Sequence, residues 1–146
     1  SIPHYTDLTI GHVHSGALGW VGYISFGALY CLVPWLWNRK GLYSLKLVNW
    51  HFWLSTLGIV LYITAMWVSG IMQGLMWRAY DEYGTLAYTF VESVDAMHPY
   101  YAMRAVGGAI FLFGTLLMLI NVLMTVRKSL SDGSLQQART AAVATA

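Results

Sequence analysis

Three long apolar stretches alternate with short polar connections along the chain. They run from about residue 8 to 37, from 47 to 72 and from 100 to 126. About 20 apolar residues in a helix, rising 1.5 Å each, cross the hydrocarbon core of a bilayer, and each stretch is longer than that. The pattern predicts an all-α integral membrane bundle of three transmembrane helices.

The composition agrees with a membrane protein. The 146 residues are 58% hydrophobic and 10% charged, whereas soluble proteins are about 25% charged. The formal charge of +2 is too small to indicate a nucleic-acid partner. Cys31 is the single cysteine and excludes a disulfide framework, so we interpret it as apolar filler.

Charges at the ends of the apolar stretches predict one orientation. The turn at 38–46 has three basic residues and no acidic one, which places it in the cytoplasm by the positive-inside rule. The connection at 73–99 contains the acidic residues Asp81, Glu82, Glu92 and Asp95, and we expect it on the other side. The basic pair at 127–128 ends the third stretch in the cytoplasm. We expect the tail at 129–146 to be exposed and poorly ordered.

Two histidines one residue apart, His12 and His14, lie inside the first stretch. Residues i and i+2 of a helix project about 200° apart, so these imidazoles need different partners. Two haems flanking one helix would provide them, because imidazole is a common axial ligand of haem iron. The alternative is that other helices satisfy both rings. The small residues nearby favour a cofactor because they leave room for a macrocycle; they are Gly11, Ser15, Gly16, Ala17 and Gly19.

Two further polar residues lie near the ends of apolar stretches. We expect His51, which begins the second stretch, to cap or hydrogen-bond rather than to bind a metal. Arg104 lies about one turn inside the third stretch, where a charge needs a partner. That partner is either the acidic connection or the anionic edge of a cofactor. The sequence has no glycine-rich phosphate loop and no Ser/His/Asp or Cys/His arrangement, so hydrolytic and nucleotide chemistry are unsupported.

The first residues contain neither an initiator Met nor a signal peptide. We therefore expect the sequence to begin inside a longer polypeptide.

The His-Val-His motif resembles the haem-ligating helix of the catalytic subunit of haem-copper oxidases. Four sequence segments resemble the cbb3-type branch of this family: HVHSGALGW at 12–20, WHFW at 50–53, GLMWRAYDEY at 74–83 and VDAMHPYY at 94–101. The resemblance covers residues 1–128 and implies the last three helices of a twelve-helix subunit I.

The resemblance implies roles for individual residues. His12 would be the proximal ligand of a high-spin haem b at the oxygen-reducing site, and hence catalytic. His14 would be one of two axial ligands of a low-spin haem b. Tyr5 and Asp7 precede them near the expected haem propionates, where helix entry with Asp7 as N-cap explains them equally well.

The same resemblance implies a propionate-binding end. His4 would donate a hydrogen bond to the haem propionates. Trp77 and Arg78 resemble the basic loop of the family that lies over these carboxylates, where a guanidinium forms charge-assisted pairs. Arg104 is a further candidate for that role.

As a whole, the resemblance implies a terminal respiratory oxidase of the bacterial inner membrane, with the 73–99 loop periplasmic. Electrons would pass from cytochrome c through c-type cytochrome subunits to two b-type haems, and oxygen would be reduced to water with proton translocation. The copper ion would be held by histidines outside this chain. The chain would be a C-terminal fragment or one piece of a split subunit, and the remainder of subunit I would be its partner within the lipid.

Two alternatives stay open at this point. The large subunit of nitric oxide reductase shares the His-x-His logic but has non-haem iron in place of copper. A non-catalytic membrane scaffold or assembly factor would use both histidines only structurally.

Overall fold

The computed structural model describes the backbone of residues 2–144 and the side chains of residues 2–127. Its elements in chain order are α1 (Asp7–His14), the π-helical segment η1 (Ser15–Gly22), α2 (Tyr23–Leu36), α3 (Leu45–Met76) and α4 (Phe90–Ala144). The first three form one continuous rod, called here the first helix. The all-α fold class is confirmed for the described part of the chain.

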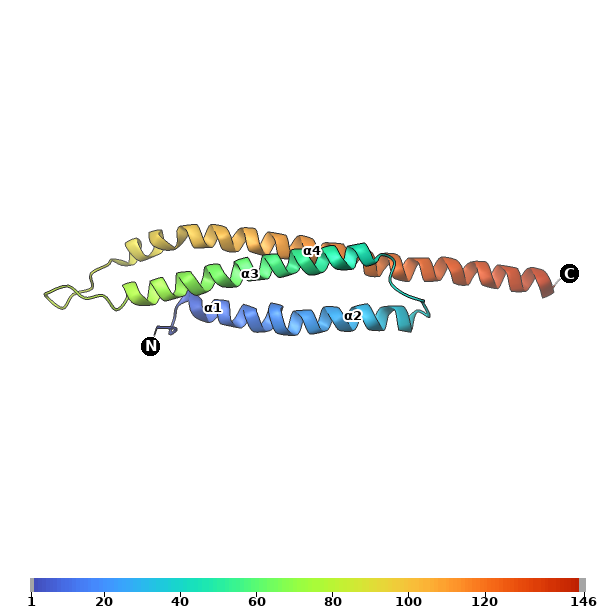
Figure 1. Cartoon of the computed structure of the whole chain (residues 1–146), viewed down its shortest axis with the longest axis horizontal. Coiled ribbons are helices and arrows are strands. Elements are labelled where there is room, and N and C mark those ends of the chain that lie inside the picture. The colour runs from blue at the N-terminus through green and yellow to red at the C-terminus, as the bar shows by residue number, and fades with distance from the viewer. Residues whose placement is uncertain (1, 145–146) are drawn as a thin grey trace.

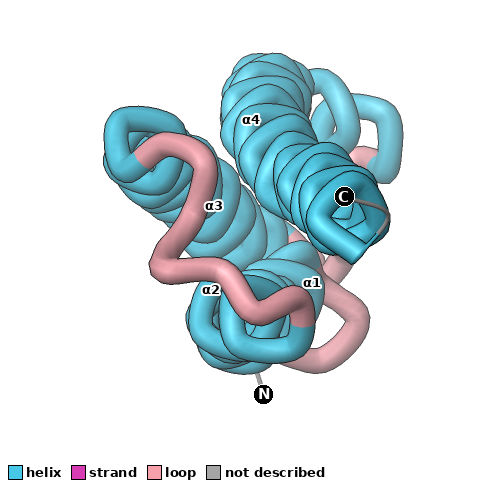
Figure 2. Tube along the Cα trace, turned by 90° about the vertical axis from the view of Figure 1, so that its right-hand side faces the viewer, coloured by secondary structure: helices cyan, strands magenta, loops and turns pink. Residues whose placement is uncertain are grey.

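Three rods lie side by side in alternating directions (Figure 1). The N-terminus and the loop between α3 and α4 lie at one end of the bundle, and the turn between α2 and α3 lies at the other. Viewed along the bundle, the first helix takes the third corner beside α3 and α4 (Figure 2). In this arrangement α1 packs on α3, and α2 also reaches α4.

Each rod has the length and apolar character of a membrane span. The spans are Asp7–Leu36, Leu45–Met76 and Phe90–Arg127, with 30, 32 and 38 residues. Helices of this length exceed the thickness of a hydrocarbon core. The chain is therefore described as a membrane protein, and the first two spans begin and end within a few residues of the predicted stretches.

Glycines bring α3 and α4 into close contact. A Cβ atom on Gly58 of α3 would lie 2.7 Å from the carbonyl oxygen of Gly107 and 2.6 Å from the backbone nitrogen of Phe111 on α4. A Cβ atom on Gly114 would lie 2.6 Å from the Ser55 hydroxyl. Because lipid gives no hydrophobic drive for association, small residues that permit such approach hold membrane helices together.

The third span begins earlier than predicted. The sequence placed Pro99 just before a helix starting at residue 100, whereas α4 begins at Phe90 and contains Pro99. A capping box explains the early start. Thr89 Oγ1 accepts a hydrogen bond from the Glu92 backbone nitrogen at 3.2 Å, and Glu92 Oε2 accepts one from the Thr89 backbone nitrogen at 2.7 Å.

The same helix also extends past its predicted end. The backbone of α4 continues to Ala144 rather than ending at residue 126. The side chains of residues 128–146 lie outside the described residues. The exposure and order of the tail at 129–146 therefore stay a prediction.

The turn between α2 and α3 is fixed by side chains of α4. Asn121 Oδ1 accepts a hydrogen bond from the Ser44 backbone nitrogen at 2.9 Å, and its Nδ2 donates to the Ser44 carbonyl at 2.9 Å. Thr125 Oγ1 accepts one from the Tyr43 backbone nitrogen at 2.9 Å. The connection that reverses the chain between the first and second spans is thereby anchored to the third.

Candidate haem-ligand site

His14 is held in one orientation by its own helix. Its Nδ1 lies 2.8 Å from the carbonyl oxygen of Ile10, one turn earlier. Because a carbonyl oxygen only accepts, this contact requires the proton on Nδ1 and leaves Nε2 as the acceptor of the neutral ring. The ring also lies against Tyr62 of α3, with centroids 4.9 Å apart. A fixed Nδ1 with a free Nε2 is the arrangement typical of metal-binding histidines.

His12 has different surroundings. Its side chain is exposed, whereas that of His14 is half-buried against α3. Its carbonyl accepts a hydrogen bond from Ser15 Oγ at 2.6 Å, where α1 passes into the π-helical segment. The two imidazoles thus leave the helix in different directions, as the spacing of the residues predicts, and each is available to a separate partner.

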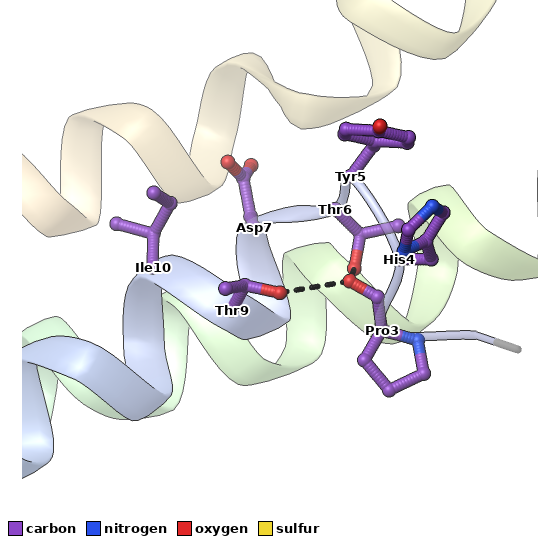
Figure 3. Close-up of a pocket in the computed structure, with 7 residues that line it drawn as sticks. All are labelled: Pro3, His4, Tyr5, Thr6, Asp7, Thr9 and Ile10. Carbon is purple, nitrogen blue, oxygen red and sulfur yellow. Dashed lines mark hydrogen bonds between the residues drawn. The ribbon is translucent and has the colours of Figure 1, made fainter.

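The segment before α1 encloses a hollow of about 640 Å³ (Figure 3). A backbone turn fixes its shape, because both Thr6 Oγ1 and Thr9 Oγ1 donate to the Pro3 carbonyl at 3.0 and 2.8 Å. Tyr5 has φ 60°, a strained conformation for a large side chain. The exposed ring of His4 lies against Tyr5, with ring centroids 4.1 Å apart and the ring planes tilted by 57°.

The two residues predicted to cover the propionates, Trp77 and Arg78, directly follow the end of α3. One turn earlier, a Cβ atom on Gly74 would meet Ile2, so the end of α3 lies beside the N-terminal segment. Trp77 is half-buried and Arg78 is exposed. The fold therefore brings these two residues to the same end of the bundle as His4.

Arg104 lies deeper in the bundle than these residues. Its guanidinium carbon is 5.0 Å from the centre of the Tyr101 ring, and Nη1 lies 3.7 Å from the Met66 sulfur. Met66 in turn lies under Gly11, since a Cβ atom there would be 3.0 Å from Met66 Cβ. The Met66 side chain thus stands between Arg104 and the turn of α1 that precedes His12. Within the described residues it has no ion pair with the acidic 73–99 connection.

His51 has the hydrogen-bonding role that the sequence predicts. It is 3% exposed, and its Nδ1 lies 2.7 Å from the Tyr30 hydroxyl on α2. Its ring also meets the edge of Phe26 at 4.8 Å between centroids. It lies far along α3 from Tyr62 and therefore away from His14. In the described part of the chain, no group of three His, Cys, Asp or Glu side chains could hold a metal ion.

Sequence reasoning missed the surroundings of Asp7. It is the first residue of α1, but its side chain bonds to α3: Oδ2 accepts from Ser69 Oγ at 2.8 Å. Its backbone nitrogen donates to Gln73 Oε1 at 2.9 Å. The interpretation of Asp7 as the N-cap is wrong, because Thr6 occupies that position. The available signal was that Ser69 and Gln73, four residues apart, are the only polar side chains in the sequence from 65 to 76.

Comparison with known proteins identifies the family. Residues 1–110 match the family model of cytochrome c and quinol oxidase polypeptide I. A cytochrome c oxidase subunit 1 homolog, bacteroid, of Bradyrhizobium diazoefficiens is 75% identical over 127 residues, which are 87% of this chain and 23% of the relative. The cbb3-type cytochrome c oxidase subunit CcoN1 of Stutzerimonas stutzeri is 58% identical over 127 residues, 87% of this chain and 27% of the relative.

The chain thus spans about a quarter of the length of these relatives. The matched region includes the first helix with both histidines, all of α3 and the beginning of α4. The chain belongs to the cytochrome c and quinol oxidase polypeptide I family.

Proposed function

We propose that this chain is part of a cbb3-type terminal oxidase, in which His12 binds the iron of a high-spin haem b and His14 binds that of a low-spin haem b. The single observation that carries the proposal is the orientation of His14. Its Nδ1–H is fixed by the Ile10 carbonyl, so that Nε2 is presented as a ligand atom. The exposed His12 on another face of the same helix leaves room for a second cofactor.

When bound, the two haems and the copper ion would transfer electrons from cytochrome c and reduce oxygen to water, coupled to proton translocation. The proposed role of the residues of this chain is to hold the two haems and to orient them. His12 and His14 fix two irons to one helix, one residue apart, which keeps the electron-transfer distance short. The ligands of the copper ion and the second ligand of the low-spin haem belong to the remainder of subunit I.

Four side chains are proposed to receive the haem propionates at the end of the bundle where the N-terminus lies. They are His4, Trp77, Arg78 and Arg104. Arg104 combines half-burial with contacts to Tyr101 and Met66, and Met66 lies beside Gly11 of α1. A planar guanidinium suits carboxylate pairs because it offers parallel N–H donors.

The proposed location is the bacterial inner membrane. The turn at 38–46 and the C-terminal tail would face the cytoplasm, and the loop between α3 and α4 would be periplasmic. The proposed partners are the remainder of subunit I, the c-type cytochrome subunits and the donor cytochrome c.

The test is a pair of substitutions in the assembled oxidase, His12→Ala and His14→Ala. His14→Ala is expected to remove the low-spin haem band from the reduced-minus-oxidised spectrum while the carbon monoxide difference spectrum remains. His12→Ala is expected to disturb the carbon monoxide spectrum. His98→Ala is the matched control, because that ring is exposed and lies 3.7 Å from the exposed Asp95 carboxylate.

Loss of the same single band in both variants would contradict the assignment of two haems to two faces. Metal analysis of the wild-type complex distinguishes an oxidase from a nitric oxide reductase, since iron without copper would exclude the oxidase. A spectrum without any b-type haem would support a structural scaffold instead.

A further inference from the structure

The carboxylate of Asp7 is built into the contact between three helices. It accepts from Ser69 Oγ, which is fully buried on α3, and the same hydroxyl lies 3.0 Å from the Met97 sulfur on α4. The backbone nitrogen of Asp7 donates to Gln73, one turn further along α3. The first turn of α1 is therefore bound to α3 through two side chains spaced by one turn.

The far side of the carboxylate faces α4. Figure 3 shows the side chain of Asp7 pointing away from α1 toward the ribbon of α4. Tyr101 on α4 interacts electrostatically with both Asp7 and Arg104, so a carboxylate, a phenol and a guanidinium follow one another there. A charged group in a membrane span is costly unless it is paired, and such networks hold their members in fixed positions.

The helical register connects this anchor to the histidines. His14 follows Asp7 by seven residues, which is about 700° of rotation and only about 20° short of two full turns. Gly11 falls between them on the same side, and a Cβ atom there would lie 2.6 Å from the Trp67 side chain of α3. Asp7, Gly11 and His14 thus form one stripe that faces α3. His12 lies about 140° away from it.

The rest of the first helix meets α3 further along the bundle. The Tyr23 hydroxyl of α2 lies 2.8 Å from Thr56 Oγ1, and the Tyr30 hydroxyl lies 2.7 Å from His51 Nδ1. Between α2 and the histidines lies the π-helical segment Ser15–Gly22, whose hydrogen-bond pattern differs from that of α1. The contacts of Asp7 and Gly11 are therefore the ones that lie within the same α-helical turns as both imidazoles.

On the basis of the proposed function, we infer that Asp7 is a positioning residue, which sets the rotation of α1 and thereby the directions of His12 and His14 by bonding to Ser69 and Gln73. It acts through the helix and touches neither haem. Without the carboxylate, the buried Ser69 hydroxyl loses its acceptor, and α1 gains freedom to turn about its axis.

The test uses the whole oxidase complex with Asp7→Ala, Ser69→Ala and the double variant. The readouts are haem content per complex, the electron paramagnetic resonance g values of the low-spin haem, and turnover. These g values report the orientation of the axial imidazole rings. Asp95→Asn, which alters an exposed carboxylate near the start of α4, is the matched control.

We expect both haems to be retained in Asp7→Ala, with shifted or broadened low-spin g values and about a tenfold loss of turnover, in the range found when groups that orient a ligand are removed. The double variant should shift no further than Asp7→Ala alone, because both changes remove one interaction. Asp7→Glu, which keeps the carboxylate, should recover part of the signal.

Assembled Asp7→Ala complexes with unchanged g values and turnover would overturn the inference. If Asp7→Ala fails to assemble, the milder Ser69→Ala and Gln73→Leu decide, and unshifted g values in both overturn it. Failure of the proposed function looks different, because the low-spin signal would then survive His14→Ala whatever residue stands at position 7.

Discussion

The α3–α4 pair and the first helix are built in contrasting ways. In α3, 39% of the most apolar window is buried within the chain, against 6% in the first helix. Gly58 and Gly107 let the backbones of α3 and α4 touch. By contrast, Trp20 and Trp35 of the first helix are 71% and 73% exposed. The two histidines proposed to bind haem iron therefore lie on the helix that is least covered by its own chain.

This difference separates the closely packed α3–α4 pair from the helix that carries His12 and His14. The first helix contacts α3 through α1, while much of its remaining apolar surface stays open. An apolar helix face that its own chain does not cover suits cofactors, lipid or the other helices of a longer subunit. The close pair supplies the packed surface, and the open helix carries the two histidines proposed as haem ligands.

Among the changes that test this contrast, Gly58→Leu is expected to lower the free energy of unfolding the most. A side chain there meets backbone atoms of α4, which cannot retreat as a flexible side chain would. We expect a loss of about 3 kcal/mol or more, at the upper end of overpacking costs. Denaturant unfolding of the chain in detergent micelles, followed by circular dichroism, measures it.

The matched change in the open helix is Gly27→Ala, since a Cβ atom at Gly27 meets nothing within 4 Å. It should leave stability unchanged or slightly raised, because alanine is the better helix former. Equal losses in both variants would remove the contrast between the close pair and the open helix.

A smaller effect is expected from Asn121→Leu, which loosens the turn joining the two regions. Asn121 is fully buried and satisfies both backbone groups of Ser44. Leaving them unpaired costs on the order of 2 kcal/mol. The turn at 37–44 should also become more open to proteolysis. Asn49→Ala, at an exposed position, is the control, and equal cleavage in both would contradict the anchoring of the turn by α4.

The smallest effect concerns the loop between α3 and α4. Asp81 accepts hydrogen bonds from the Thr85 hydroxyl at 2.6 Å and from the Thr85 and Tyr83 backbone nitrogens at 2.8 and 2.9 Å. These bonds, the Thr85 hydroxyl first, lower the pKa of the Asp81 carboxyl below its ordinary value. Its contribution to loop order is complete above the unfolded pKa of about 3.9 and is lost as the pH falls through the lowered value.

Thr85→Val should therefore raise the pKa of Asp81 toward its ordinary value, as a carboxyl-detected NMR titration would record. The helix content of α3 and α4 should not change. An unaltered pKa would mean that the Thr85 hydroxyl does not hold the carboxylate.

Sequence patterns were sufficient to locate some of the helices but not all of their ends. Long apolar runs located the first two spans because length and hydropathy alone decide membrane crossing. The start of α4 was misplaced because Pro99 is a common helix boundary, whereas the capping box of Thr89 and Glu92 determines the actual start. Local hydrogen bonding overruled the proline signal.

The sequence likewise predicted one feature of the candidate site and missed another. The spacing of His12 and His14 determined that their side chains project in different directions, since helix geometry is fixed by local bonds. It did not show that Asp7 is hydrogen-bonded to Ser69, because these two residues are 62 positions apart. Long-range polar pairs leave little trace in a single sequence.

By itself, the sequence determined that three helices are long enough to cross a membrane and that two imidazoles leave the first of them in different directions. Only the tertiary structure decided which way each imidazole points. That direction follows from the docking of α1 on α3 through Asp7 and Gly11, and helical periodicity fixes relative angles within a helix but leaves its rotation against its neighbours free.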